Sequence, residues 1–132
     1  MGRISGNIKG TFIRACQGDK WAQYQVAIGY EKGIETKKDT KSAFVWMQRS
    51  AMRGFFKAQT DLSMYYTYGI GTEADLEKAL FWGKQAAYLG YLPAQKYVVE
   101  CYRRGIGTER NMKMACKWLR YMARDLQPDH VN

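Results

Sequence analysis

The sequence has few of the residues that build metal sites and disulfide frameworks. Its 132 residues include three cysteines and a single histidine, His130, which lies in the C-terminal tail. Cys16, Cys101 and Cys116 form no CxxC pair, whereas a zinc site needs about four cysteine or histidine ligands at matched spacing. We therefore expect no metal and no cofactor, and we predict that the three thiols are reduced and buried.

Long apolar runs and catalytic constellations are also missing. No stretch approaches the roughly 18 consecutive apolar residues that span a bilayer, and the basic N-terminus lacks the apolar region of a signal peptide. These absences predict a cytoplasmic protein without membrane contact, or one that is exported by a route the sequence does not reveal. The Gly-Ile-Gly-Thr segments at 69–72 and 105–108 complete neither GxGxxG nor GxxxxGK. With no ordered Ser/His/Asp set, we expect no catalytic residues and no enzyme activity.

The dominant positive feature is a repeat of 36 residues. Ala-Gln pairs, tyrosines, Gly-Ile pairs, tryptophans and alanines return in phase three times. The recurring positions are Ala22-Gln23, Ala58-Gln59 and Ala94-Gln95; Tyr30, Tyr66 and Tyr102; Gly33, Gly69 and Gly105; Asp39, Asp75 and Asn111; Ala43, Ala79 and Ala115; Trp46, Trp82 and Trp118; and Ala51, Ala87 and Ala123. A fixed period of this size is typical of stacked supersecondary units that share one core.

Each unit is a helical hairpin. In the middle unit, apolar spacing predicts a first helix (helix A) over 57–68, which Gly69 ends in a left-handed conformation. A short loop leads to Asp75, whose carboxylate caps a second helix (helix B) over 76–89. Pro93 suits the first turn of the next helix. The alignment of Ala15 and Gly18 with Ala51 and Gly54 adds a lone leading helix near 8–17.

The recurring residues predict the core. Alanines let the helix backbones approach closely, and Trp46, Trp82 and Trp118 fill the remaining space. We also expect the next repeat to bury Met52, Phe81 and Tyr88.

These positions resemble the Sel1-like repeat, a relative of the tetratricopeptide repeat. The matching residues are Ala22-Gln23-Tyr24, Tyr30-Glu31-Lys32-Gly33, Asp39, Ala43, Trp46, Ala51 and Gly54, with their counterparts 36 and 72 residues later. The resemblance implies an all-α, right-handed superhelical solenoid of three helix pairs behind the leading helix. It divides a single domain, 1–132, into repeats 22–57, 58–93 and 94–129.

The chain departs from the family pattern in two places. Glu35 replaces the second loop glycine, so the first loop is expected to differ in shape. Leu126 replaces the glycine that follows helix B in the earlier repeats, so the array is expected to stop there.

The net charge of +9 is concentrated toward the ends of the chain. Lys113, Lys117, Arg120 and Arg124 fall on one face of the last helix, which we call the basic stripe. Two interpretations stay open. One is that the stripe is a polar cap. The equivalent face of the earlier B helices carries the apolar residues Val45, Phe81, Met52 and Tyr88 and is expected to be covered by the next repeat, whereas the face of the last helix has to be polar. Alternatively, it binds an anionic partner.

The A helices carry the residues that differ between repeats. The resemblance implies that they line a concave face on which family members bind other proteins, as adaptors or scaffolds. The predicted partner-binding residues are Tyr24, Ile28, Glu31 and Lys32; Thr60, Met64, Thr67 and Tyr68; and Lys96, Glu100, Arg103 and Arg104. Exposed Tyr, Ile and Met beside charges are typical of protein interfaces.

The sequence therefore predicts an interaction module whose partner is a protein, and electrostatics would steer an acidic partner toward the third repeat. One alternative is binding of nucleic acid or another polyanion through the basic terminal repeats. A further alternative is an inhibitor or immunity-type protein that uses the same surface. We expect a monomer or a weak homo-oligomer.

Overall fold

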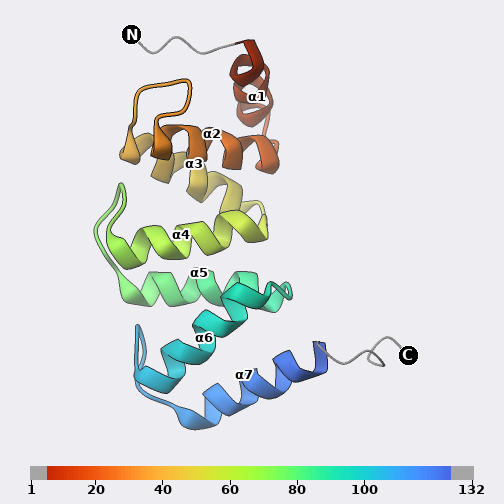
Figure 1. Ribbon diagram of the computed structural model, residues 1–132, viewed down its shortest axis with the longest axis vertical. Helices are drawn as coiled ribbons and strands as arrows, with labels where there is room; N and C mark the ends of the chain where they lie inside the picture. The colour runs from red at the N-terminus through yellow and green to blue at the C-terminus, as the bar shows by residue number, and fades with distance from the viewer. Residues whose placement is uncertain (1–5, 126–132) are drawn as a thin grey trace.

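The computed structural model describes residues 6–125, and this range folds as a stack of helices joined by short loops. Figure 1 shows the stack running from α1 at the top to α7 at the bottom. Each helix packs chiefly against its neighbours in the chain. The helices are α1 (Gly6–Cys16), α2 (Lys20–Lys32), α3 (Thr40–Met52), α4 (Phe56–Tyr68), α5 (Leu76–Tyr88), α6 (Leu92–Arg104) and α7 (Met112–Asp125).

This arrangement confirms the all-α solenoid of three helix pairs behind one leading helix. Helices α2, α4 and α6 are the predicted A helices, and α3, α5 and α7 are the B helices. Expected boundaries at 8–17, 57–68 and 76–89 lie within two residues of the observed ones. The end predicted for the third repeat, near 129, and the stop at Leu126 lie outside the described residues.

The helix ends use the same devices in every repeat. Gly33, Gly69 and Gly105 follow the A helices with φ of 69°, 69° and 72°, the left-handed region that glycine adopts at little cost. In the loop that follows, the carboxylate of Asp75 accepts a hydrogen bond from the Lys78 amide at 3.1 Å. Because these caps satisfy amides at the start of each B helix, each hairpin turns at the same point.

A side-chain hydrogen bond joins each repeat to the one before it. The Gln59 amide Nε2 donates to the backbone carbonyl of Ala51 at 3.2 Å. Gln23 and Gln95 make the same bond to Ala15 and Ala87, at 3.1 and 3.2 Å. All three glutamines are buried. Each of these carbonyls also accepts from the backbone amide three residues later, that of Gly18, Gly54 or Gly90. The Ala-Gln pair therefore recurs because its amide fills the second acceptor site of a carbonyl at the end of the preceding B helix.

The repeating tryptophans lie in the core, but not to the same depth. Trp46 and Trp118 are buried, and Trp46 packs edge-on against Phe12 with ring centroids 5.5 Å apart. Trp82 is half-buried and packs against the core from its margin. For the tryptophans the core prediction is confirmed, and Trp82 is the most accessible of the three.

The expectation that Met52, Phe81 and Tyr88 are buried is wrong. Their exposed fractions are 70%, 51% and 59%. Each B helix packs chiefly against the A helices before and after it in the chain, and Met52, Phe81 and Tyr88 lie on the side that these contacts leave in water. The Tyr88 ring also contacts Trp118 of the next repeat, with centroids 5.1 Å apart, and stays largely exposed. The 36-residue period alone does not distinguish the side of a B helix that meets the next repeat from the side that faces solvent.

The last helix exposes the flank that a further repeat would cover. Leu119 is 50% exposed, whereas its equivalent Met47 is fully buried. Ala123 and Cys116 are exposed as well, although Ala51 and Leu80 at the same positions are buried. The expectation that Ala123 faces the core is therefore wrong, because no described helix follows α7.

The prediction of three buried thiols holds only for Cys101. Cys16 and Cys116 are exposed and free, since one lies on the outer face of α1 and the other on the open flank of α7. Burial raises the pKa of the Cys101 thiol.

Glu35 leaves the first loop with the same backbone conformation as the glycine loops. Its φ is 60°, close to 70° at Gly71 and 72° at Gly107. A Cβ at Gly71 would lie 2.1 Å from the Thr40 carbonyl oxygen, and one at Gly107 2.2 Å from that of Leu76. Glu35 is exposed. The expected difference in loop shape is therefore absent at this residue, although a side chain occupies a left-handed position.

Substitutions in these loops separate backbone strain from crowding. We expect Glu35→Gly to raise the free energy of unfolding by up to about 1 kcal/mol, because it relieves a left-handed side-chain residue at some entropic cost. Gly71→Ala should lower it by about 2–4 kcal/mol, since strain and a backbone collision combine. Urea unfolding followed by far-UV circular dichroism measures both. Equal effects of the two changes would contradict the close packing at Gly71.

The tryptophans should differ in their contribution to stability. We expect Trp118→Ala to lower the free energy of unfolding by about 3–5 kcal/mol, the usual cost of truncating a large buried aromatic. Trp82→Ala should cost roughly half as much, because less of its surface leaves water on folding. Urea titrations of the two variants test the order, and a larger loss at Trp82 would refute it.

Candidate functional site

The A helices present a surface that combines apolar and charged side chains. We call the outward side of α2, α4 and α6, with the twelve predicted partner-binding residues, the A-helix surface. Six of the twelve are exposed: Lys32, Met64, Tyr68, Lys96, Arg103 and Arg104. The other six are half-buried and are partly used by the fold.

Two half-buried residues of α2 serve packing between repeats. The Tyr24 ring stands edge-on to Phe55 at 5.2 Å, and Ile28 packs against the first core cluster. The Tyr24 hydroxyl donates to Oδ2 of Asp61 at 2.9 Å. Burial, followed by the charge of Asp61, raises the Tyr24 pKa well above its ordinary value. These side chains shape the surface, and much of their own area is already covered.

Hydrogen bonds fix most of the remaining half-buried residues. Glu31 accepts from the Tyr65 hydroxyl at 2.7 Å. Thr60 and Thr67 donate to carbonyls one turn earlier in α4, those of Phe56 and Ser63, at 2.9 and 2.8 Å.

The basic side chains of α6 are not equally available. Arg103 makes two 2.8 Å hydrogen bonds to the carboxylate of Glu100, one from Nε and one from Nη2. This pairing lowers the pKa of Glu100. Arg104 and Lys96 are exposed and, among the described residues, have no carboxylate within 4.0 Å. Lys96 and Arg104 are therefore the cations of α6 that form no ion pair in the described part of the chain.

A cavity of about 280 Å³ opens between α4 and α6. Thr60 and Met64 of the predicted set line it, together with residues that sequence reasoning did not select. The added residues are Asp61, Ser63, Gly83, Pro93, Ala94 and Tyr97. A comparison of equivalent positions in the sequence could have pointed to this cavity, because Gly83 stands where the other two repeats carry the large residues Met47 and Leu119.

The basic stripe lies on the outer face of α7, and all four of its side chains are exposed. Among the described residues none of them forms an ion pair within 4.0 Å. The cap interpretation is wrong, because Val45, Phe81, Met52 and Tyr88 at the equivalent positions are exposed too. The flank that a further repeat would cover carries Leu119 instead, so the stripe is not explained by the end of the array.

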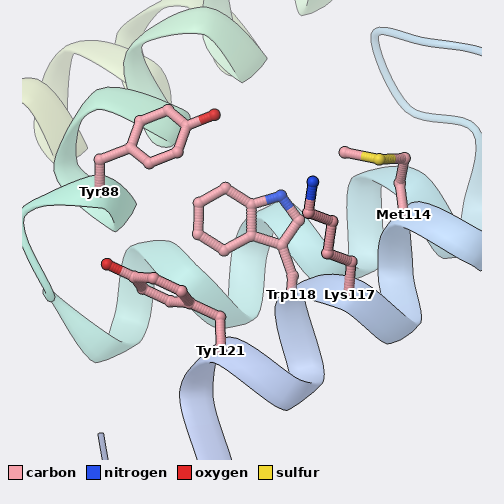
Figure 2. Close-up of a pocket in the computed structure, with 5 residues that line it drawn as sticks. All are labelled: Tyr88, Met114, Lys117, Trp118 and Tyr121. Atoms are coloured by element: carbon pink, nitrogen blue, oxygen red, sulfur yellow. The ribbon is translucent and has the colours of Figure 1, made fainter. Parts of the chain in front are cut away.

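A small aromatic pocket lies beside the stripe (Figure 2). Its volume is about 110 Å³, and Tyr88, Met114, Lys117, Trp118 and Tyr121 line it. The indole of Trp118 lies between the rings of Tyr88 and Tyr121, with centroids 5.1 and 5.6 Å away. The stripe is therefore bordered by apolar rings on one side.

The repeat frame matches a known family over most of the chain. The Sel1 repeat profile matches residues 22–55, 56–91 and 94–125. The chain belongs to the Sel1 repeat family. No curated protein matches it.

Solved structures of Sel1 repeat proteins share the fold. A Sel1 repeat protein from Oxalobacter formigenes is 32% identical with a TM-score of 0.76, over 81% of this chain and 44% of its own. The protein c5321, a protective antigen of uropathogenic Escherichia coli, is 30% identical with a TM-score of 0.84, over 93% and 26%. This chain thus spans less than half the length of either relative.

A third structure supports the fold alone. Helicobacter pylori cysteine-rich protein B is 16% identical with a TM-score of 0.68, over 98% of this chain and 96% of its own. Among the helices described here, none combines the length and apolar character that crossing a bilayer requires.

Asp61 is the one carboxylate of the cavity, and its replacement tests its electrostatics. Burial raises the pKa of Asp61, so ionisation costs folding free energy, and the wild type loses stability as pH rises through the folded-state pKa. We expect Asp61→Asn to be at least as stable as wild type at pH 7, with the difference shrinking near pH 3. Urea unfolding at both pH values measures this, and a less stable variant at pH 7 would contradict it.

Proposed function

We propose that the chain is an adaptor or scaffold module that binds a partner protein on the A-helix surface. Sel1 repeats generally mediate protein–protein interaction. The observation that carries the placement is the pair Met64 and Tyr68, which are 45% and 68% exposed on α4. Side chains of this size gain free energy when a partner removes them from water.

The α6 part of the A-helix surface carries positive charge. Lys96 and Arg104 lie on α6, the A helix that follows the one carrying the apolar pair, and they lack an ion-pair partner among the described residues. Tyrosine and arginine are the residue types that most often dominate binding energy. Positive charge also accelerates association with an acidic segment. The proposed partner therefore places acidic residues toward the third repeat.

A second candidate function is polyanion binding by the basic stripe. The observation that favours it is four exposed cations on α7 without an ion pair in the described part of the chain. Such a face binds phosphate backbones by releasing counterions, with strong salt dependence.

We place the protein in a reducing compartment, the cytoplasm. Cys16 and Cys116 are exposed free thiols, and such thiols persist where cellular reductants keep them reduced.

Reversing charge on one face and then the other tests the proposal. We expect Lys96→Glu with Arg104→Glu to weaken binding of a partner captured from the native host by about tenfold, because an acidic partner then meets like charge. Pull-down at moderate salt with nuclease, followed by titration calorimetry of the captured partner, measures the change.

The matched control is Lys113→Glu with Lys117→Glu, which alters net charge equally on the outer face of α7. Its affinity for the same partner should stay near that of the wild type. If the control pair abolishes binding and nuclease treatment releases the partner, the second candidate replaces the first.

A further inference from the structure

The cavity between α4 and α6 lies at the junction of the second and third repeats. Two positions there hold small residues, whereas the equivalent positions at the preceding junction hold large side chains. At the preceding junction, Met47 is fully buried and Tyr24 packs against Phe55. Thirty-six residues later these positions are Gly83 and Thr60, and both line the cavity. The cavity therefore exists because the second junction has small residues at positions where the first junction has large ones, while the backbone arrangement is the same.

Tyr97 occupies only part of the space that Gly83 leaves. A Cβ at Gly83 would lie 2.8 Å from the Tyr97 ring, so the ring rests directly on the α5 backbone. The Tyr97 hydroxyl is 3.4 Å from Oγ1 of Thr67. These contacts fix the ring as one side of the cavity, with Met64 and Pro93 as further apolar lining.

Asp61 supplies a carboxylate with unused acceptor capacity. Tyr24 is its one hydrogen-bond donor among the described residues, at 2.9 Å to Oδ2. Burial raises the pKa of Asp61 most, and the charge of Glu31 adds to it, whereas the Tyr24 hydrogen bond and the charges of Lys32 on α2 and Lys57 on α4 lower it. Neither lysine comes within 4.0 Å of Asp61. A half-buried carboxylate in this position gains from a further donor.

We propose that this cavity receives a lysine or arginine side chain of the partner protein, with Asp61 as the carboxylate that pairs with it. The inference rests on the proposed function, since it names the chemistry of a partner for the same surface. The partner thus combines a basic residue for the cavity with acidic residues for Lys96 and Arg104.

A basic side chain suits both parts of the lining. Its aliphatic stem packs against Met64 and Pro93, while its charged head reaches polar atoms. Cation–π attraction to Tyr97 adds to the pairing with Asp61. An acidic side chain would be repelled by Asp61, and an apolar one would bury the carboxylate without a new partner.

Panning a phage-displayed library of random dodecapeptides against the full chain tests the inference. We expect the selected peptides to share a lysine or arginine. Thr60→Tyr should weaken them by at least about tenfold, because it fills the cavity with the residue that the first repeat carries at this position. Circular dichroism and urea unfolding establish that the variant remains folded.

A double-mutant cycle isolates the ion pair. Asp61→Asn keeps an acceptor for the Tyr24 hydroxyl and removes the charge, and norleucine in the peptide removes the ammonium of lysine. We expect each change to weaken binding by about 3- to 10-fold and the second to add little after the first. Glu73→Gln is the matched control, because it removes an exposed carboxylate that lies outside the A-helix surface and does not line the cavity, and it should leave affinity unchanged.

The outcomes separate this inference from the proposed function. Peptides that are lost with Lys96→Glu and Arg104→Glu but bind Thr60→Tyr and Asp61→Asn normally would overturn the cavity site and leave the proposed function standing. Apolar consensus peptides indifferent to Asp61→Asn would overturn the basic occupant. Peptides insensitive to every variant of the A-helix surface would count against both, and a library without binders would count against the cavity as a peptide site.

Discussion

The stack depends on one buried hydrogen bond repeated at every junction, from a glutamine amide at the start of an A helix to a carbonyl at the end of the preceding B helix. That carbonyl also accepts the amide of the glycine that follows the helix. The glutamine occupies its second acceptor site, and a hydrogen bond of this kind contributes about 0.5–1.5 kcal/mol. Only close backbone approach brings the amide within reach, which explains the alanines beside it. Because the same bond recurs, successive repeats adopt nearly the same relative placement.

A fixed junction makes differences between repeats meaningful. Where Met47 and Tyr24 occupy the first junction, Gly83 and Thr60 leave an opening in the second, since the backbones cannot move together to close it. Close-packed interiors otherwise contain few voids. The cavity is therefore a feature of sequence variation on a rigid frame, and Asp61 gives it one defined chemical preference.

The outer face of the B helices follows a different rule. Its residues contribute little to the junctions, so their character changes freely along the stack, from Met52 and Phe81 to the cations of α7. The flank left open after α7 is apolar at Leu119. The charged outer face and the apolar flank are thus two different sides of α7. Each side can make its own kind of interaction.

The sequence by itself determined the helices, their order and most of the core, because caps, glycines and alanines act within a few residues and repeat in phase. It also selected the exposed pair Met64 and Tyr68. It did not reveal that Arg103 is paired with Glu100, that Phe81 points outward, or that Gly83 and Asp61 border one cavity. Those facts depend on how far neighbouring helices are rotated about their axes and which flanks meet, a long-range packing outcome that a 36-residue period leaves open.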